Sequence, residues 1–349
     1  MKKYTLNETP VKTTNGFKIN NITVDLDIPN VDKFNIFNIN TNEIKDLDIT
    51  IDKCKNEKIY SGIGLEDKLD YKITINLDDY TELNDDVIIE YHFTNEEPKL
   101  SSLIDIKAGN NTKAHFIIKY ISEEKDYNFN YLKQITPVGD NSNITISILP
   151  VLNEESTSLI AIENKIGENS KLIHNYYDLK GKTRISNYYT DLLNNNSENY
   201  LNNIYLGKKN SLIDMNYHTD LKGKKTKTNM NSVGAIKDDC YKAYKATVDF
   251  KEGAVKANGI ENENCIILSD TAISRSLPML LCHEEDVAGS HSVSSGKIDN
   301  QKLFYLMSRG LSKKEALKLI VNASFNEVVE KQKNQELKEC VLNIINKEL

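Results

Sequence analysis

The feature that most constrains this chain is a repeating rhythm of short strands and polar turns between residues 100 and 290. Segments such as "SLIDIKAGNNTKAHFIIKYIS" predict a strand, a tight Gly-Asn turn and a second strand, each strand about four to seven residues long. A unit this small cannot bury its apolar face alone, so successive units must pack on one another. The rhythm therefore predicts a coiled stack of strands, with an antiparallel sandwich as the alternative.

A local echo supports a repeat. The segment "YDLKGKTR" at residues 177–184 returns as "TDLKGKKT" at 219–226, so that Asp178 and Asp220 lie 42 positions apart. This echo, together with the strand rhythm, suggests a coiled stack, and the antiparallel sandwich stays open as the alternative.

The regions on either side of the rhythm differ from it. Residues 1–84 form a β-rich N-terminal region, with alternating segments at 17–28 and 71–77, and a further strand is expected in 85–93. Residues 85–299 form the core. Residues 300–349 are helical: Gly310 ends a first helix, and Ser312 with Glu315 forms the capping box of a second. A last amphipathic helix has one apolar face, formed by Leu337, Cys340, Val341, Ile344 and Ile345.

Composition narrows the function classes. The net charge of −7 argues against general nucleic-acid binding. Five scattered cysteines without a C-x-x-C pair favour reduced thiols. The N-terminus lacks the pattern of a signal peptide, and no apolar run is long enough to span a membrane. We therefore expect a cytoplasmic protein without a membrane partner.

The chemistry-bearing residues gather in "LLCHEEDVAGSHSVSSGKID" (280–299). The acidic run 284–286 is typical of a solvated turn. His291 lies among glycine and serine residues, which leave room around its imidazole. It is either a structural histidine or a ligand for iron or zinc, if a second side chain reaches the ion. Cys265 is expected to be a buried thiol. No phosphate-binding loop occurs, so any ATP chemistry must come from a partner.

The segment "DVAGSHSVSSGKIDNQKLFYLMSRGLSKKEALKLIVNASFNEVV" (286–329) resembles the SufB and SufD scaffold proteins of the SUF iron–sulfur cluster assembly system. The matching residues are Ser290, His291, Ile298, Asp299, Leu303, Phe304, Tyr305, Leu306, Ser308, Arg309, Gly310, Leu311, Ser312, Glu315 and Ala316. The resemblance extends more faintly over residues 85–345.

The resemblance implies a mainly β fold: a right-handed parallel β-helix core followed by a C-terminal α-helical region. It implies a non-enzymatic scaffold whose C-terminal helices bind the SufC-type ABC ATPase. The residues expected to contact it are Leu303, Phe304, Tyr305, Arg309, Leu317, Ile320 and Val321. The core is expected to pair with a SufB-type scaffold, or with a second copy. No cofactor is expected to be held stably by this chain alone. A transient iron–sulfur cluster or iron would lie at the shared interface.

Two departures make the chain most similar to SufD. The functional cysteine of SufB falls on Glu263 in a gapless comparison, and Ser292 follows His291 where SufB has glutamate. His291 is then expected to be a metal ligand across the interface from a SufB cysteine. A gap of two residues would instead make Cys265 the equivalent cysteine, and the chain a SufB-like scaffold that pairs with itself. Two further alternatives are a polysaccharide-active β-helix enzyme and a metal-free structural homodimer.

Overall fold

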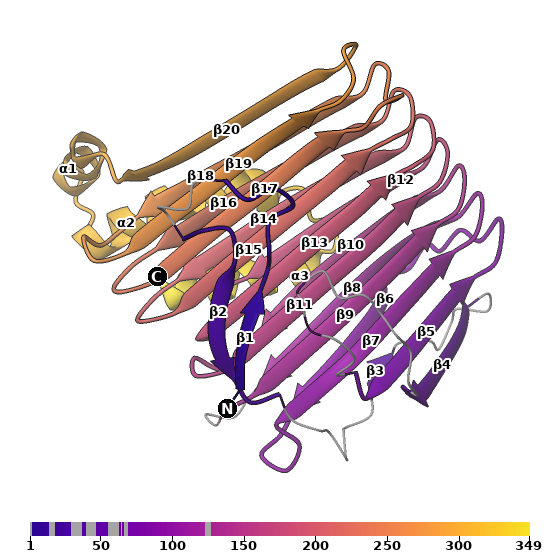
Figure 1. The fold of residues 1–349 in the computed structure, drawn as a ribbon. Helices are drawn as coiled ribbons and strands as arrows, with labels where there is room; N and C mark the ends of the chain where they lie inside the picture. The colour runs from indigo at the N-terminus through magenta and orange to yellow at the C-terminus, as the bar shows by residue number, and fades with distance from the viewer. Residues whose placement is uncertain are drawn as a thin grey trace.

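The computed structural model describes residues 2–13, 18–28, 37–39, 47–54, 63, 65, 69–122 and 127–349. Its body is a β-solenoid of two nine-stranded sheets (Figure 1), named here the even sheet and the odd sheet after the numbers of their strands. Consecutive strands alternate between the sheets, so each coil gives one strand to each. Eight strands of each sheet run parallel. The mainly β, coiled architecture predicted from the sequence is confirmed, and the antiparallel sandwich is wrong.

Along the stack, the even sheet consists of β3 (Asn38–Ile39), β6 (Val87–Phe93), β8 (Lys113–Ser122), β10 (Asn143–Val151), β12 (Lys171–Asp178), β14 (Glu198–Gly207), β16 (Lys227–Ile236), β18 (Asn258–Ile267) and β20 (Ala288–Lys297). The odd sheet consists of β4 (Leu47–Lys53), β5 (Tyr71–Leu77), β7 (Lys99–Ala108), β9 (Phe129–Val138), β11 (Thr157–Ile166), β13 (Thr183–Leu192), β15 (Leu212–Leu221), β17 (Tyr241–Phe250) and β19 (Ile273–Cys282).

The coil repeat is shorter than the sequence echo. Neighbouring strands pair Lys171 with Glu198, 27 residues on, and Lys227 with Asn258, 31 residues on. Asp178 ends β12 of the even sheet, whereas Asp220 lies in β15 of the odd sheet. The echo thus compares strands from different sheets and is not the structural period. Most strands of the stack have ten residues, more than the predicted four to seven. The prediction was too short because polar residues also occupy inward positions and interrupt the apolar pattern.

The turns explain why the coils stack in register. Asn111, Asn141, Asn169 and Asn196 adopt the left-handed conformation, each with φ of 55°. Asparagine tolerates this conformation better than most residues do. Each donates its backbone N–H to the turn of the next coil, as Asn141 does to the Glu168 carbonyl (2.8 Å). A Cβ on the glycine that opens such a turn would lie 2.6 Å from the turn before it, at Gly139 for example. Only glycine allows this approach.

The interior changes along the stack. Around the first coils it is apolar, with Ile73, Ile89 and Phe116 fully buried. From the middle coils onward it contains buried ion pairs, such as Arg184 with Asp178 (3.2 Å) and Lys242 with Glu263 (2.5 Å). Buried charges are costly unless they are paired and hydrogen-bonded. The interior is therefore more polar from the middle of the solenoid to its C-terminal end.

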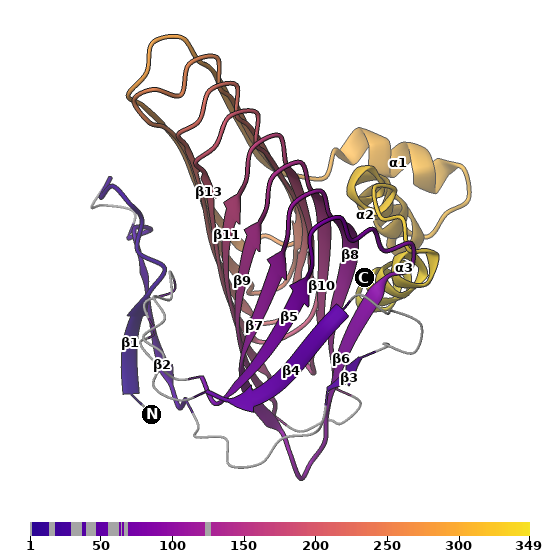
Figure 2. The same cartoon turned by 90° about the vertical axis from the view of Figure 1, so that its right-hand side faces the viewer.

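Three helices follow β20: α1 (Asn300–Ser308), α2 (Lys313–Val329) and α3 (Gln335–Glu348). The predicted capping box at Ser312 is confirmed, and Gly310 has a φ of 98°. Helices α2 and α3 pack on the outer face of the even sheet (Figure 2). The buried face of α3 contains three of its five predicted residues, and Cys340 and Ile344 are half-buried beside them. Across the described residues, no helix is both long and apolar enough to cross a membrane.

The N-terminal region is part of the same body. Strand β1 (Lys2–Leu6) forms a hairpin with β2 (Ile22–Leu26), which packs on the outer face of the odd sheet (Figure 2). Strands β3 and β4 pair antiparallel with the first coil. The predicted segment 17–28 forms β2, although its first residue lies outside the described residues. The first parallel strand begins at Tyr71, ahead of the boundary predicted at residue 85.

Candidate functional site

The C-terminal end of the solenoid is open. Within the described part of the chain, β20 pairs only with β18, and β19 pairs only with β17 (Figure 1). All ten residues of β20 are exposed. Ala288 donates its N–H to the Ala257 carbonyl (2.9 Å), toward β18. In a parallel strand, alternate residues direct their backbone groups to opposite sides. It follows that the backbone groups of the other set point to the open edge: Gly289, His291, Val293, Ser295 and Lys297.

His291 belongs to the inward-facing positions of the last coil. It is the register partner of Glu261 in β18, whose side chain is buried inside the solenoid. Neighbouring strands are about 4.8 Å apart, so the imidazole and this carboxyl group share one small region. The absence of a further coil leaves His291 exposed, although its side is the interior side. The structure therefore places the predicted metal ligand at the mouth of the polar interior.

Glu261 is unusual because its carboxyl group is buried without a charge partner. Burial, and secondarily the nearby charge of Glu263, raise the pKa of Glu261 to about 9. The Met279 backbone amide lowers that pKa, yet neither carboxyl oxygen forms a hydrogen bond of normal geometry with a described residue. At neutral pH the side chain keeps its proton. A strongly perturbed carboxyl group at an opening is a candidate functional group.

Glu263, by contrast, is fully paired. Its carboxylate oxygens accept from Lys242 Nζ (2.5 Å), Tyr205 Oη (2.7 Å) and Ser276 Oγ (2.5 Å). Lys242 is completely buried and also donates to Ser276 Oγ (3.0 Å). A buried ion pair is tolerated when hydrogen bonds satisfy both charges. In the gapless comparison that puts Glu263 at the position of the SufB cysteine, the side chain at that position is a lysine-bound carboxylate.

Cys265 cannot share an ion with His291 within one chain. It lies on the same inward face of β18, but four residues beyond Glu261, which corresponds to about 13 Å along a strand. The thiol is buried, as predicted, and burial raises its pKa. A thiol in this environment is a poor source of thiolate. The remaining metal ligand at His291 would have to come from another chain or from Glu261.

The acidic run after β19 is a solvated turn, as predicted. Glu284 Oε2 accepts from the Gly253 backbone (3.1 Å), and its other oxygen accepts from Glu285 (3.0 Å). His283 lies in the same turn, with Nε2 3.6 Å from Asp249 Oδ1. The two histidines of this segment therefore lie in different places: His283 is beside Asp249, and His291 is at the open end of the solenoid.

Helix α1 and its C-cap expose three of the seven residues predicted to bind a partner. Phe304 is 73 % exposed and Tyr305 is 56 % exposed, which is high for aromatic side chains. The Arg309 guanidinium lies 5.3 Å from the Tyr305 ring centroid. Leu303 is half-buried. These residues form an exposed apolar surface next to the open end (Figure 1).

Helix α2 requires one correction. Val321, predicted to contact a partner, is fully buried in the core that α2 forms with the even sheet. It faces the sheet because it shares a helical stripe with Phe325 and Val328. Leu317 and Ile320 are half-buried, and the exposed apolar residue of this helix is Leu319, at 49 %. The candidate partner surface is thus α1 with the outer edge of α2.

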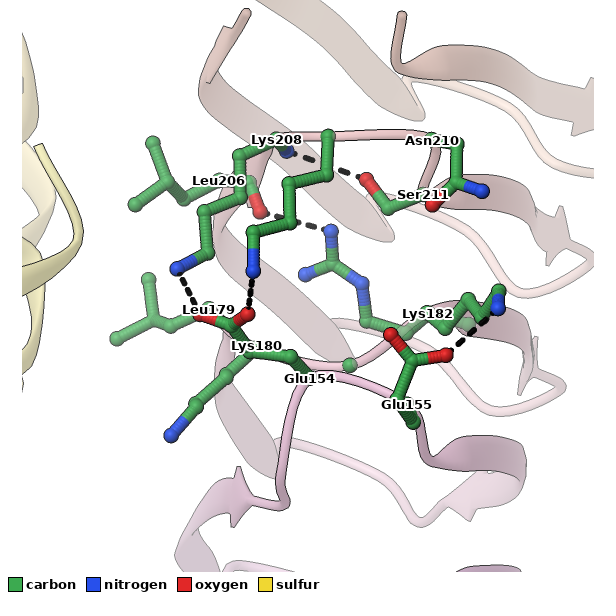
Figure 3. Close-up of a pocket in the computed structure, with 12 residues that line it drawn as sticks. Glu154, Glu155, Leu179, Lys180, Lys182, Leu206, Lys208, Asn210 and Ser211 are labelled. Carbon is green, nitrogen blue, oxygen red and sulfur yellow. Dashed lines mark hydrogen bonds and ion pairs between the residues drawn. The ribbon is translucent and has the colours of Figure 1, made fainter. Parts of the chain in front are cut away.

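A pocket near the end of α3 is filled by ion pairs (Figure 3). Its cavity of about 20 Å³ is no larger than a water molecule needs. Glu154 binds Lys208 (2.5 Å) and Lys209, and Lys182 binds Glu155 (2.6 Å). Lys208 also binds Glu348 at the end of α3. These ion pairs attach the end of α3 to the turns of the solenoid.

The comparison with known protein families agrees with this geometry. A family model described as "SUF system FeS cluster assembly, SufBD core domain" matches residues 92–324, well over half of the chain. The chain belongs to the SufBD family. The family match begins at the end of β6, covers the strands from β7 to β20 and continues through helix α1 into α2. The predicted membership is confirmed.

Individual relatives include SufD proteins. The chain is 24 % identical to the iron–sulfur cluster assembly protein SufD of Bacillus subtilis over 262 residues, which is 74 % of this chain and 60 % of the relative. It is 26 % identical to SufD of Escherichia coli, over 53 % of this chain and 44 % of the relative. An iron–sulfur cluster assembly SufBD family protein of Pyrococcus horikoshii is 29 % identical, over 52 % and 40 %. The chain spans about half the length of these relatives.

Sequence reasoning missed the interior residues Lys242 and Glu261. Each lies at an inward position of its strand, where a buried ionisable group marks a candidate functional residue. The sequence feature that could have identified them is the spacing of the turns "GNNT", "GDNS" and "GENS", which begin at Gly109, Gly139 and Gly167. Their period would have shown which residues face inward.

Proposed function

We propose that this SufBD family member is a non-catalytic, SufD-like scaffold subunit that supports iron–sulfur cluster assembly by pairing through its open end. The observation that carries the proposal is β20: an exposed ten-residue strand with an unpaired edge and with His291 in the interior register. The partner is a SufB-type scaffold, or a second copy of this chain.

The edge of β20 lacks the usual protection against pairing. Free edges are normally guarded by charges, proline or a bulge. The strand "AGSHSVSSGK" has small residues at most positions, and its one permanent charge is the terminal Lys297. Its five edge-facing residues offer backbone donors and acceptors to an added strand. A partner strand that pairs here would satisfy them and extend the sheet.

At such an interface, His291 would offer a neutral imidazole to iron or to a nascent cluster, which is the substrate being assembled. The chain's own thiol, Cys265, is too far away to complete the site, so the thiolate would come from the partner. The paired Lys242 and Glu263 would hold the mouth of the interior rigid, because their hydrogen bonds fix both side chains.

The exposed surface of α1 is the proposed docking site for a SufC-type ABC ATPase. Two residues separate the end of β20 from the start of α1. One of them, Asp299, caps the helix by accepting from the Gln301 backbone (2.8 Å). A movement of the ATPase would therefore reach β20 through a short, capped junction and could open the paired edge.

The test is co-expression of this chain with the SufB-type scaffold and the ATPase from the same organism. Val293→Pro removes an edge-facing N–H and leaves the bonds to β18 in place, because proline is tolerated on edge strands. We expect this variant to fold but to lose the scaffold partner, while the matched variant Val293→Thr keeps it. A Val293→Pro chain that copurifies normally would disprove pairing through β20. Self-pairing would show as a homodimer with the same sensitivity.

A further inference from the structure

A second cluster of ligand-type side chains lies on the outer face of the odd sheet, away from His291. It contains His218 and Asp220 of β15 and Asp249 of the neighbouring strand β17 (Figure 1). One ligand atom from each residue lies within 4.8 Å of the other two. His218 Nε2 is 2.7 Å from Asp220 Oδ1.

The strand register brings these residues together. His218 and Asp220 are two residues apart and therefore face the same side. Asp220 is the register partner of Asp249, so two carboxylates lie side by side on adjacent strands. Like charges in such a position repel each other unless a cation lies near them. Lys251 supplies one: its Nζ is 2.5 Å from Asp249 Oδ2 and 3.5 Å from Asp220 Oδ1.

One carboxylate oxygen remains without a hydrogen bond. Asp249 is 3 % exposed, and its Oδ1 is buried without a hydrogen-bond partner in the described structure. His283 Nε2 lies 3.6 Å from that oxygen, which is too long for a hydrogen bond. A buried, unsatisfied carboxylate oxygen is costly, and a bound cation would satisfy it.

One member of the cluster, His218, faces a cavity. A cavity of about 390 Å³ has His218, Tyr189 and Glu8 in its wall. The Glu8 carbonyl accepts from Asn216 Nδ2 (3.0 Å), which fixes the N-terminal segment as one side of that cavity. The Lys251 side chain is 36 % exposed and that of His283 is 60 % exposed. Because both side chains reach the solvent, we expect the lysine to move away and the histidine to approach when an ion binds.

We propose that His218, Asp220 and Asp249, with His283 as fourth ligand, bind a divalent transition-metal ion such as Zn²⁺ or Fe²⁺. Two imidazoles with two carboxylates form a donor set suited to such ions rather than to Ca²⁺ or Mg²⁺. The two carboxylates balance the charge of the ion. Tyr189 Oη donates to Asp220 Oδ2 (2.9 Å) and orients that ligand, as outer-shell partners of metal sites do.

Binding would exchange one cation for another. The metal displaces the Lys251 ammonium group into solvent and replaces the hydrogen bond between His218 Nε2 and Asp220 Oδ1. The site does not depend on the pairing proposed for β20.

The experiment uses the untagged, metal-free full chain, titrated with Zn²⁺ by calorimetry and with Co²⁺ by visible absorption. We expect one equivalent of Co²⁺ to give ligand-field bands. Asp249→Asn and His218→Gln should each weaken binding at least tenfold, with unchanged circular dichroism. Lys251→Ala should bind more tightly, because the competing ammonium group is gone. This exposed variant keeps the test decisive if a ligand variant fails to fold.

The His291→Ala chain separates this site from the proposed interface site. It should keep the equivalent that Asp249→Asn loses. Binding that disappears with His291→Ala and survives in Asp249→Asn would overturn the proposal, as would weaker binding by Lys251→Ala. Either of those results would leave the pairing function of β20 intact.

Discussion

The buried carboxyl group of Glu261 leads to a sharp prediction on stability. Its pKa is raised from 4.5 to about 9 in the folded chain. Between these values the folded state holds one more proton than the unfolded state, so stability falls as pH rises. Each pH unit costs about 1.4 kcal/mol. At pH 7 the penalty is about 3 kcal/mol relative to a side chain that is neutral in both states.

Glu261→Gln replaces the protonated carboxyl group with a neutral group of the same shape. The isolated variant should therefore be more stable than the parent by about 3 kcal/mol at pH 7, by less at pH 6 and by more at pH 8. Urea unfolding of both chains at the three pH values measures the difference. Glu285→Gln, in the exposed turn nearby, is the control and should leave the pH dependence unchanged. A difference that stays constant with pH would refute the reasoning.

Two further predictions concern the helices. Phe304→Ala should weaken ATPase binding at least tenfold in a pull-down or calorimetric assay without changing the melting temperature, because the ring is exposed; a lower melting temperature would show that the ring supports the fold. Phe325→Ala should cost about 3–5 kcal/mol of stability, because this buried ring joins α2 to the even sheet; a loss below about 1 kcal/mol would show that α2 is loosely attached.

The helices and their caps were the most predictable part of the chain. The capping box at Ser312 and the stop at Gly310 are local signals, and the structure contains both. The face of α3 followed from spacing alone. Val321 was wrongly assigned to the partner surface, because some apolar residues of α2 pack on the sheet and others face the solvent. A sequence pattern does not say which apolar face is covered.

The interior of the solenoid was the least predictable part. The contact between Lys242 and Glu263 can be predicted only from the coil period, because the two residues lie on strands of different sheets and are 21 residues apart. The echo around Asp178 gave a false period, because similar turns follow strands of both sheets. The position of His291 at an open end depends on the coils that precede it. The resemblance to SufB and SufD supplied that expectation, and physical periodicity alone did not.

The metal content of the assembled complex tests the central claim most directly. The chain, the SufB-type scaffold and the ATPase are co-expressed without oxygen, and bound iron and sulfide are measured for the parent and for His291→Ala. The account predicts that both complexes form and that iron and sulfide fall in the variant alone, because the edge of β20 pairs normally but lacks its imidazole. Equal iron and sulfide in the two complexes would contradict it, and would leave His291 as a structural residue on a pairing strand.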